Sequence, residues 1–272
     1  MSILKALILG ILQGLTEFLP VSSSGHLVVM QHYLGFKQPM LLFDALLHIA
    51  TLAVVIIYFR KDLYEITLDL IGLKREHRKE ISARTLYLVL LGTIPTALIG
   101  LSFKKWIEAS FTMNFLTPGM FLFTGTLLWI GEKKAKVNKE MDKISIMDAL
   151  IIGTAQGIAI TPGISRSGAT ISVGLLRGVK KEAAFHYSFL LSIPAIIGAM
   201  GIELREAALK ENLPHQILPW MVGALAAFLV GYLSLMVLRK ALLRRKFFLF
   251  AIYCWIIGGG LFIMQLIGRY GG

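Results

Sequence analysis

Six stretches of this chain are apolar for long enough to cross a lipid bilayer as helices. They lie at 42–59, 85–103, 115–131, 183–201, 217–238 and 247–267. A helix needs roughly 20 apolar residues to cross the hydrocarbon core of a membrane. Only 16% of the 272 residues are charged, whereas about a quarter are charged in a soluble domain. The sequence therefore predicts an all-α integral membrane protein with six transmembrane helices.

An internal repeat adds two shorter hydrophobic segments. Residues 10–25 (GILQGLTEFLPVSSSG) align without gaps with residues 153–168 (GTAQGIAITPGISRSG). Each copy is a short apolar stretch, a break that contains Pro and Ser, and a second short apolar stretch. Neither stretch is long enough to span, and irregular backbone is tolerated in a membrane only inside protein or beside a water-filled cavity. We therefore expect two re-entrant helical hairpins, at residues 1–36 and 147–180.

The positive charges predict how the chain crosses the membrane. Twenty of the 28 Lys and Arg residues fall in four segments, at 60–84, 132–143, 177–182 and 239–246. Such loops stay on the cytoplasmic side in bacterial membrane proteins. Three spans separate the hairpins, so the hairpins enter from opposite sides and form an inverted-topology repeat. The first repeat is residues 1–131, the cytoplasmic linker 132–145 and the second repeat 146–272, within one integral membrane domain.

Two loops carry further expectations. Residues 202–216 hold Glu203, Glu206 and Glu211 against Arg205 and Lys210, a balance that suits the outer side of the membrane. Residues 60–84 suit either a cytoplasmic amphipathic helix with a turn or a solvated basic loop.

Three features of the composition have ordinary explanations. The net charge of +12 follows from the basic loops and indicates contact with anionic lipid headgroups, with no nucleic-acid partner. Cys254 lies in the last apolar block and is expected to be a small buried hydrophobic residue. The N-terminus resembles a signal peptide, but Gln13, Glu17 and Pro20 interrupt its apolar run, so we expect it in the mature protein.

The first hairpin carries polar side chains at its break. Gln13 and Glu17 are four residues apart and share one helix face. A carboxylate in an apolar hairpin faces the protein interior or a cavity; it then serves chemistry or only pairs with a cation to hold the hairpin. The break continues with Ser22, Ser23, Ser24, Gly25 and His26. Such serines cap the next helix, and free N–H groups at a helix start attract phosphate.

In the second hairpin the corresponding run is Ser165, Arg166, Ser167 and Gly168. Arg166 is the one Lys or Arg outside the loops and termini, and its planar guanidinium matches phosphate oxygens in two contacts. A structural salt bridge to Glu17 is the competing interpretation, and the two roles could alternate. If the breaks meet, the inventory suits phosphoryl transfer, with Gln13 and Glu17 as oxygen ligands for Mg²⁺ or Ca²⁺.

The other histidines divide into two groups. Asp44 and His48, four residues apart at the start of the first span, either extend this site or lie at the membrane interface. The remaining ones show no constellation in the sequence and are expected to be interfacial or loop residues; they are His32, His77, His186 and His215.

With these residues the chain resembles the undecaprenyl-pyrophosphate phosphatase family associated with bacitracin resistance. The likeness covers nearly the whole length and rests on QGLTEFLPVSSSGH (13–26) and PGISRSGATIS (162–172). This family is a membrane-embedded, metal-dependent hydrolase. The resemblance implies that Glu17 is the key acid of an (E/Q)xxxE element that begins at Gln13. It also implies that His26 is the essential histidine, Arg166 the phosphate-binding arginine and Ser23 the proposed nucleophile; Ser24 stands where some members carry Thr.

The expected function is hydrolysis of undecaprenyl pyrophosphate to undecaprenyl phosphate and inorganic phosphate. This reaction recycles the lipid carrier for cell-wall synthesis and confers bacitracin resistance. We expect it in the bacterial plasma membrane, with the site facing the outer (periplasmic) side. A covalent seryl-phosphate and direct attack by water both stay open, as do the preferred metal, the tail length and the oligomeric state, including a homodimer.

Three rival interpretations give different expectations. A structural membrane scaffold would leave the buried Arg166 and Glu17 without a purpose. A transporter or flippase also uses inverted repeats with broken helices, but it needs no paired acid, imidazole and hydroxyl nucleophile. Phosphatases of the phosphatidic-acid type require a further histidine a few residues beyond a Ser-Arg pair, and none follows Arg166.

Overall fold

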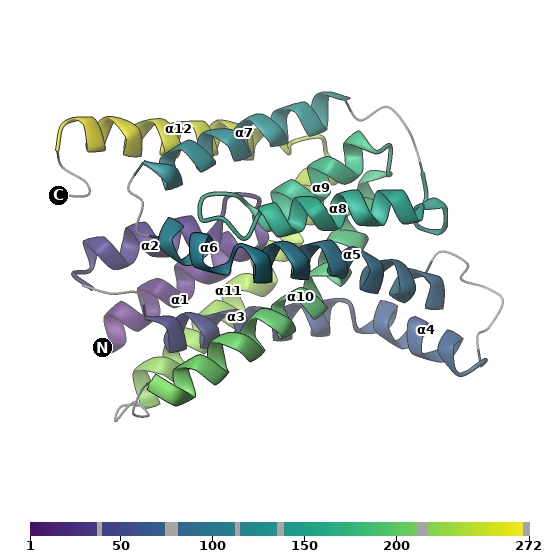
Figure 1. Ribbon diagram of the computed structural model, residues 1–272, viewed down its shortest axis with the longest axis horizontal. Coiled ribbons are helices and arrows are strands. Elements are labelled where there is room, and N and C mark those ends of the chain that lie inside the picture. The colour runs from purple at the N-terminus through teal and green to yellow at the C-terminus, as the bar shows by residue number, and fades with distance from the viewer. Residues whose placement is uncertain (37–39, 74–80, 112–114, 135–138, 211–216, 269–272) are drawn as a thin grey trace.

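Figure 1 shows the computed structural model, which describes residues 1–36, 40–73, 81–111, 115–134, 139–210 and 217–268. Most of these residues are helical, and the one β pairing among them is an isolated bridge between Lys139 and Val179. The helices are α1 (Ile3–Phe18), α2 (Ser23–Tyr33), α3 (Leu41–Tyr58), α4 (Arg60–Leu70), α5 (Ala83–Ser102), α6 (Lys104–Ser110), α7 (Leu116–Lys134), α8 (Ile146–Ile158), α9 (Arg166–Leu176), α10 (Lys181–Lys210), α11 (Ile217–Leu243) and α12 (Phe248–Leu266), with a 3-10 turn at Met141–Lys143.

Several helices are long and apolar enough to cross a membrane. Among the described residues four pass by length and composition: α5, the Lys181–Ile202 part of α10, α11 and α12. A fifth passes when α3 is counted with α4, which follows it after a 66° bend. The apolar blocks at 42–59 and 115–131 correspond to α3 and α7, although α7 is not among those that pass. The chain is therefore a multi-pass membrane protein.

The two predicted hairpins are present as pairs of short helices. α1 packs on α2 and α8 packs on α9, and four-residue and seven-residue breaks separate the partners. In Figure 1 both pairs lie in the middle of the molecule, with α7 and α12 along one side and α3 and α10 along the other. The polar breaks are therefore enclosed by the longer helices.

Helix packing follows the sequence repeat. α1 packs on α11 of the second half, and its counterpart α8 packs on α5 of the first half. A Cβ added at Gly10 would lie 2.2 Å from the carbonyl oxygen of Gly223, and one added at the aligned Gly153 would lie 1.9 Å from that of Gly92. The two halves thus clasp each other through equivalent glycine contacts, which require backbones closer than any side chain allows.

Some boundaries differ from the sequence expectation. The loop expected at 202–216 is helical up to Lys210, and the basic loop expected from 239 is helical up to Leu243. Both extensions contain Leu, Ala, Arg and Lys, and the first also contains Glu; all of these residues favour helix. Residues 60–70 form the helix α4, one of the two forms expected there, while 74–80 lie outside the described residues. The short helix α6 was not anticipated.

Candidate active site

The centre of the site is the carboxylate of Glu17, in the last turn of α1. Its Oε1 accepts a hydrogen bond from an Arg166 guanidinium N–H at 2.6 Å. Its Oε2 accepts a hydrogen bond from the Ser23 hydroxyl at 2.6 Å and another from the Gln13 amide N–H at 3.1 Å. Glu17 and Gln13 are buried, whereas 18% of the Arg166 side chain is exposed. The two hairpins therefore meet at one carboxylate, 149 residues from its arginine partner in sequence.

Helix geometry explains how these side chains converge. Gln13 and Glu17 lie one turn apart on α1, so both reach the same point. Ser23 is the first residue of α2 and Arg166 the first residue of α9. These two residues occupy the same position in the sequence repeat. Each hairpin thus aims the first residue of its second helix at Glu17.

The tips of the hairpins are fastened by their serines. The Oγ of Ser22 caps α2 by accepting from the Gly25 N–H at 3.4 Å, and it also accepts from the Gly163 N–H at 3.1 Å. Ser165 caps α9 through the Gly168 N–H at 3.1 Å. Ser167 lies on the same turn and donates from its hydroxyl to the Phe18 carbonyl at 2.9 Å. The second hairpin therefore donates both of these hydrogen bonds between the tips, one from the Gly163 N–H and one from the Ser167 hydroxyl.

Backbone strain marks the first tip. Ser22 has φ 68°, in the left-handed region that a residue with a side chain occupies at a cost of roughly 1–3 kcal/mol. The same tip packs on Gly163, which has φ 93° and whose added Cβ would lie 2.6 Å from the Thr117 carbonyl oxygen. Ser24 is half-buried and its hydroxyl lies 3.3 Å from that of Ser22. The strained turn places three hydroxyls at the start of α2, and the Ser23 hydroxyl is the one of them that contacts Glu17.

Comparisons with known proteins find similar chains over nearly the whole length. Residues 6–260 match the family described as Bacitracin resistance protein BacA. The chain is 46% identical to an undecaprenyl-diphosphatase of Syntrophotalea carbinolica, over 97% of this chain and 100% of that protein. It is 42% identical to one of Carboxydothermus hydrogenoformans, over 99% and 100% of the two chains. This chain belongs to the BacA family. The match includes both hairpins, so the site described above lies within the shared region.

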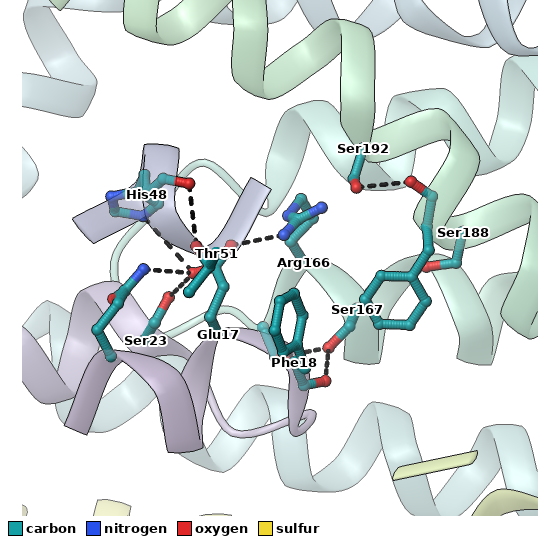
Figure 2. A network of polar contacts seen from close by, with 12 residues as sticks. Glu17, Phe18, Ser23, His48, Thr51, Arg166, Ser167, Ser188 and Ser192 are labelled. Carbon is teal, nitrogen blue, oxygen red and sulfur yellow. Dashed lines mark hydrogen bonds and ion pairs between the residues drawn. The ribbon is translucent and has the colours of Figure 1, made fainter. Parts of the chain in front are cut away.

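His48 of this BacA family member lies on the far side of the carboxylate. Figure 2 shows Arg166 and His48 on opposite sides of Glu17. The His48 Nε2 is 3.6 Å from Glu17 Oε2, and its Nδ1 is 2.8 Å from the Asp44 carbonyl oxygen. The Asp44 carboxylate accepts from the Gln31 amide at 2.8 and 2.9 Å. Of the two interpretations left open for His48, the structure favours an extension of the site.

His26 is held away from this cluster. Its Nδ1 lies 2.7 Å from the Ser22 carbonyl oxygen and its Nε2 lies 2.8 Å from the Tyr253 hydroxyl. The ring packs edge-on against Phe121 at 5.0 Å. It lines an apolar cavity of about 230 Å³ between α1, α2, α7 and α12. The structure therefore joins Glu17, Ser23, Gln13 and Arg166, and it gives no contact between His26 and these four.

The chemistry of the donor set fits a hard cation. In the described part of the chain, no three His, Cys, Asp or Glu side chains form a metal-binding group. Gln13 adds an amide oxygen, however, and this Oε1 is buried without a hydrogen-bond partner. Glu17 beside it supplies carboxylate oxygens, which Mg²⁺ and Ca²⁺ prefer. Two protein oxygens suffice where substrate phosphate and water complete the shell.

Several contacts were beyond sequence reasoning. The expectation that His186 belongs to no constellation is wrong, because its Nδ1 lies 2.6 Å from Asp62 Oδ2 and its Nε2 3.6 Å from Glu182. His32 is exposed, and His77 and His215 lie outside the described residues. Cys254 is fully buried, as expected. Thr124, which binds the second tip, and Tyr253 gave no signal in the sequence, because neither lies near a polar motif.

Proposed function

We propose that this protein hydrolyses undecaprenyl pyrophosphate to undecaprenyl phosphate and inorganic phosphate. One observation carries the proposal: the two halves bring Arg166, Glu17 and Ser23 to one point, with two helix starts beside them. The family match and the relatives named undecaprenyl-diphosphatase support the same reaction. This activity recycles the lipid carrier for cell-wall synthesis and confers resistance to bacitracin.

Pyrophosphate binding begins at Arg166. Its guanidinium already pairs with one carboxylate oxygen. A pyrophosphate offers the guanidinium similar oxygen acceptors and carries more negative charge than the carboxylate. The helix starts at Ser23 and Arg166 add N–H groups and dipoles that favour an anion. We propose that the hydroxyls of Ser22, Ser24, Ser165 and Ser167, with the turns at Gly25 and Gly168, line this anion site. Arg166 then exchanges Glu17 for substrate.

The Ser23–Glu17 hydrogen bond places a base on a nucleophile. If Ser23 attacks, its Oγ bonds to the terminal phosphorus and its proton passes to Glu17. The bridging P–O bond breaks, and the electron pair leaves with undecaprenyl phosphate. Water then hydrolyses the seryl-phosphate. If water attacks directly, Glu17 takes its proton and Ser23 orients it. Rapid-quench trapping of labelled phosphate separates the routes, because only the first puts the label on Ser23.

His26 is proposed to meet the leaving group. A carbonyl only accepts hydrogen bonds, so the proton on Nδ1 is held by Ser22 and Nε2 is the group available for exchange. On binding, the ring protonated at both nitrogens would donate from Nε2 to a phosphate oxygen of the leaving group, in place of its contact with the Tyr253 hydroxyl. Tyr253→Phe removes this competitor and is expected to preserve turnover, whereas His26→Ala abolishes most of it.

A divalent cation, Mg²⁺ or Ca²⁺, is proposed at Gln13 and Glu17. When bound, it would offset the negative charge of the pyrophosphate. The amide of Gln13 is neutral, so it is a weaker ligand than a glutamate in its place. Removal of divalent ions with a chelator is expected to stop phosphate release, and adding back excess Mg²⁺ is expected to restore it.

The membrane arrangement is proposed as six spans with two oppositely inserted hairpins, in the bacterial plasma membrane. The reciprocal packing of α1 on α11 and of α8 on α5 supports the inversion. The basic segments support a cytoplasmic linker and a site open to the outer side, with the isoprenoid tail in lipid. A reporter fused at residue 138 is expected to be cytoplasmic. Light scattering of the detergent-solubilised protein tests for a homodimer.

The decisive assay is phosphate release from undecaprenyl pyrophosphate by the purified protein. Arg166→Ala and Glu17→Ala are each expected to lower kcat by at least about 100-fold. Arg239→Gln is the matched control, since this arginine pairs with Glu182 in another part of the fold, and it should keep near-normal turnover. Wild-type protein that binds the lipid but releases no phosphate would instead favour a lipid-carrier transporter.

A further inference from the structure

The position of His48 suggests a ligand that the sequence did not identify. Its Nδ1 faces the Asp44 backbone carbonyl at 2.8 Å. Because a carbonyl only accepts, Nδ1 carries the proton, and in the neutral ring the lone pair is on Nε2. That nitrogen points at Glu17 Oε2 across 3.6 Å. A neutral imidazole nitrogen and a carboxylate oxygen both offer lone pairs, so the contact is favourable only with a proton on Nε2 or with a cation shared between the two atoms.

The side-chain amide of Gln13 also lies beside Glu17 Oε2. Its Nε2 is 3.1 Å from Glu17 Oε2, while Oε1 has no partner. The two ends of an amide have nearly the same shape, so turning it over presents Oε1 to that point instead. Gln156 in the second repeat also has an unpaired Oε1, but its amide faces Thr96 and a backbone carbonyl. Gln13 differs from Gln156 because it lies beside the Glu17 carboxylate, which the His48 imidazole also approaches.

We infer that His48 Nε2 is a nitrogen ligand of the divalent cation at Glu17 and Gln13. The ring is oriented as in known metal sites, where a ligating histidine donates its other N–H to a carbonyl or carboxylate. The Asp44 carbonyl has this role here, and α3 fixes its distance because the two residues are one turn apart. Arg166 occupies Glu17 Oε1, whereas Oε2, which also accepts from Ser23 and Gln13, is the oxygen that lies toward His48.

A nitrogen ligand changes which metals bind well. Imidazole favours transition metals over Ca²⁺, and among these the affinity rises from Mn²⁺ upward. The site is therefore expected to bind Mn²⁺ more tightly than Ca²⁺. The role of the metal site in the protein rests on the proposed phosphatase function. The assignment of His48 as a ligand does not, because metal binding can be measured without substrate.

The test uses metal-stripped, full-length protein in detergent, titrated with Mn²⁺. Pulsed electron paramagnetic resonance detects a directly bound imidazole as ¹⁴N modulation of the Mn²⁺ echo. Wild type is expected to show it. His48→Gln should lose it and bind Mn²⁺ at least about tenfold more weakly, since even outer-shell partners are worth about 10–100-fold. The affinity for Ca²⁺, measured alongside, should change less.

Two further variants make the result specific. His186→Gln is the matched control, because that side chain is 23% exposed against 24% for His48 and also pairs with carboxylates; it should keep both the modulation and the affinity. His48→Glu supplies a charged carboxylate where His48→Gln has a neutral amide, so it should bind Mn²⁺ more tightly than His48→Gln yet show no ¹⁴N modulation. This pattern also excludes misfolding as the cause.

The outcomes separate the ligand from the function. Modulation that persists in His48→Gln, that disappears in His186→Gln, or that is absent from Mn²⁺-bound wild type overturns the assignment of His48. If such a wild type still releases phosphate, the proposed hydrolase stands without this ligand. If modulation depends on His48 but no phosphate is released, the metal site stands and the proposed function fails.

Discussion

The two hairpins have the same framework and different chemistry. Both cap their second helix with an aligned serine, Ser22 or Ser165. At the position where the first hairpin has Glu17, however, the second has Ile160. Where the first has Ser23, the second has Arg166, and both of these contact Glu17. The two copies of the repeat thus share the serine caps that fix the breaks. They differ in the reactive side chains, which are divided between them, so neither hairpin forms the site alone.

Making the hairpins alike at the central position should have the largest effect. Glu17→Ile gives the first hairpin the residue of the second and removes the base and the Arg166 partner together. We expect kcat for phosphate release to fall by at least about 100-fold, because general acid–base groups contribute about 10²–10⁴-fold. Ile160→Leu at the aligned position is the control and should stay within about threefold of wild type. Turnover preserved in Glu17→Ile would show that the asymmetry is unrelated to catalysis.

Placing a side chain in the glycine contacts should have a large effect on folding in both halves. Gly10→Ala and Gly153→Ala each put a Cβ within 2.2 Å of a carbonyl oxygen, and crowding of this kind costs about 1–3 kcal/mol. We expect comparable falls in melting temperature for the two variants. Gly259→Ala meets nothing within 4 Å and serves as the control. A loss in one half only would mean that the two clasps are not equivalent.

The smallest expected effect is the difference in stability between the loss of one helix-capping serine and the loss of the other. Loss of a serine cap costs about 1 kcal/mol, so Ser165→Ala should lower the free energy of unfolding by that amount. Ser22→Ala should cost about 1 kcal/mol more, because its oxygen also accepts the Gly163 N–H. Denaturation in mild detergent, followed by circular dichroism, measures both. Equal losses would indicate that the bond between the hairpin tips contributes nothing.

Much of this framework could be predicted because long apolar blocks and an internal repeat mark its helices in the sequence. The six apolar blocks each form a helix, and the repeat alignment located the hairpins. The salt bridge between Glu17 and Arg166 was one of the two interpretations left open for that arginine. The end of α10 was misplaced because charged helix formers continue the helix beyond the apolar block. Contacts between distant elements left no local signal. His26 meets Tyr253 227 residues away, and His186 meets Asp62 124 residues away.

The His48 contact shows the same limit in the site itself. Its spacing from Asp44 was visible, and that spacing gives the bond between the ring and the backbone carbonyl. Its approach to Glu17 depends on how α3 packs between α10 and α11, which periodicity does not encode. The sequence could therefore propose the residues of the site but not which histidine lies against the acid.

The central claim is that a carboxylate and a guanidinium from opposite halves act as one unit on a pyrophosphate. A double-mutant cycle on kcat/KM tests it most directly, with Glu17→Gln, Arg166→Lys and the double variant assayed on undecaprenyl pyrophosphate. Residues that act together are strongly non-additive, so the double variant should be no more than about threefold worse than the poorer single variant. Losses that multiply would show that the two groups act independently, which would contradict a single catalytic unit shared by the two halves.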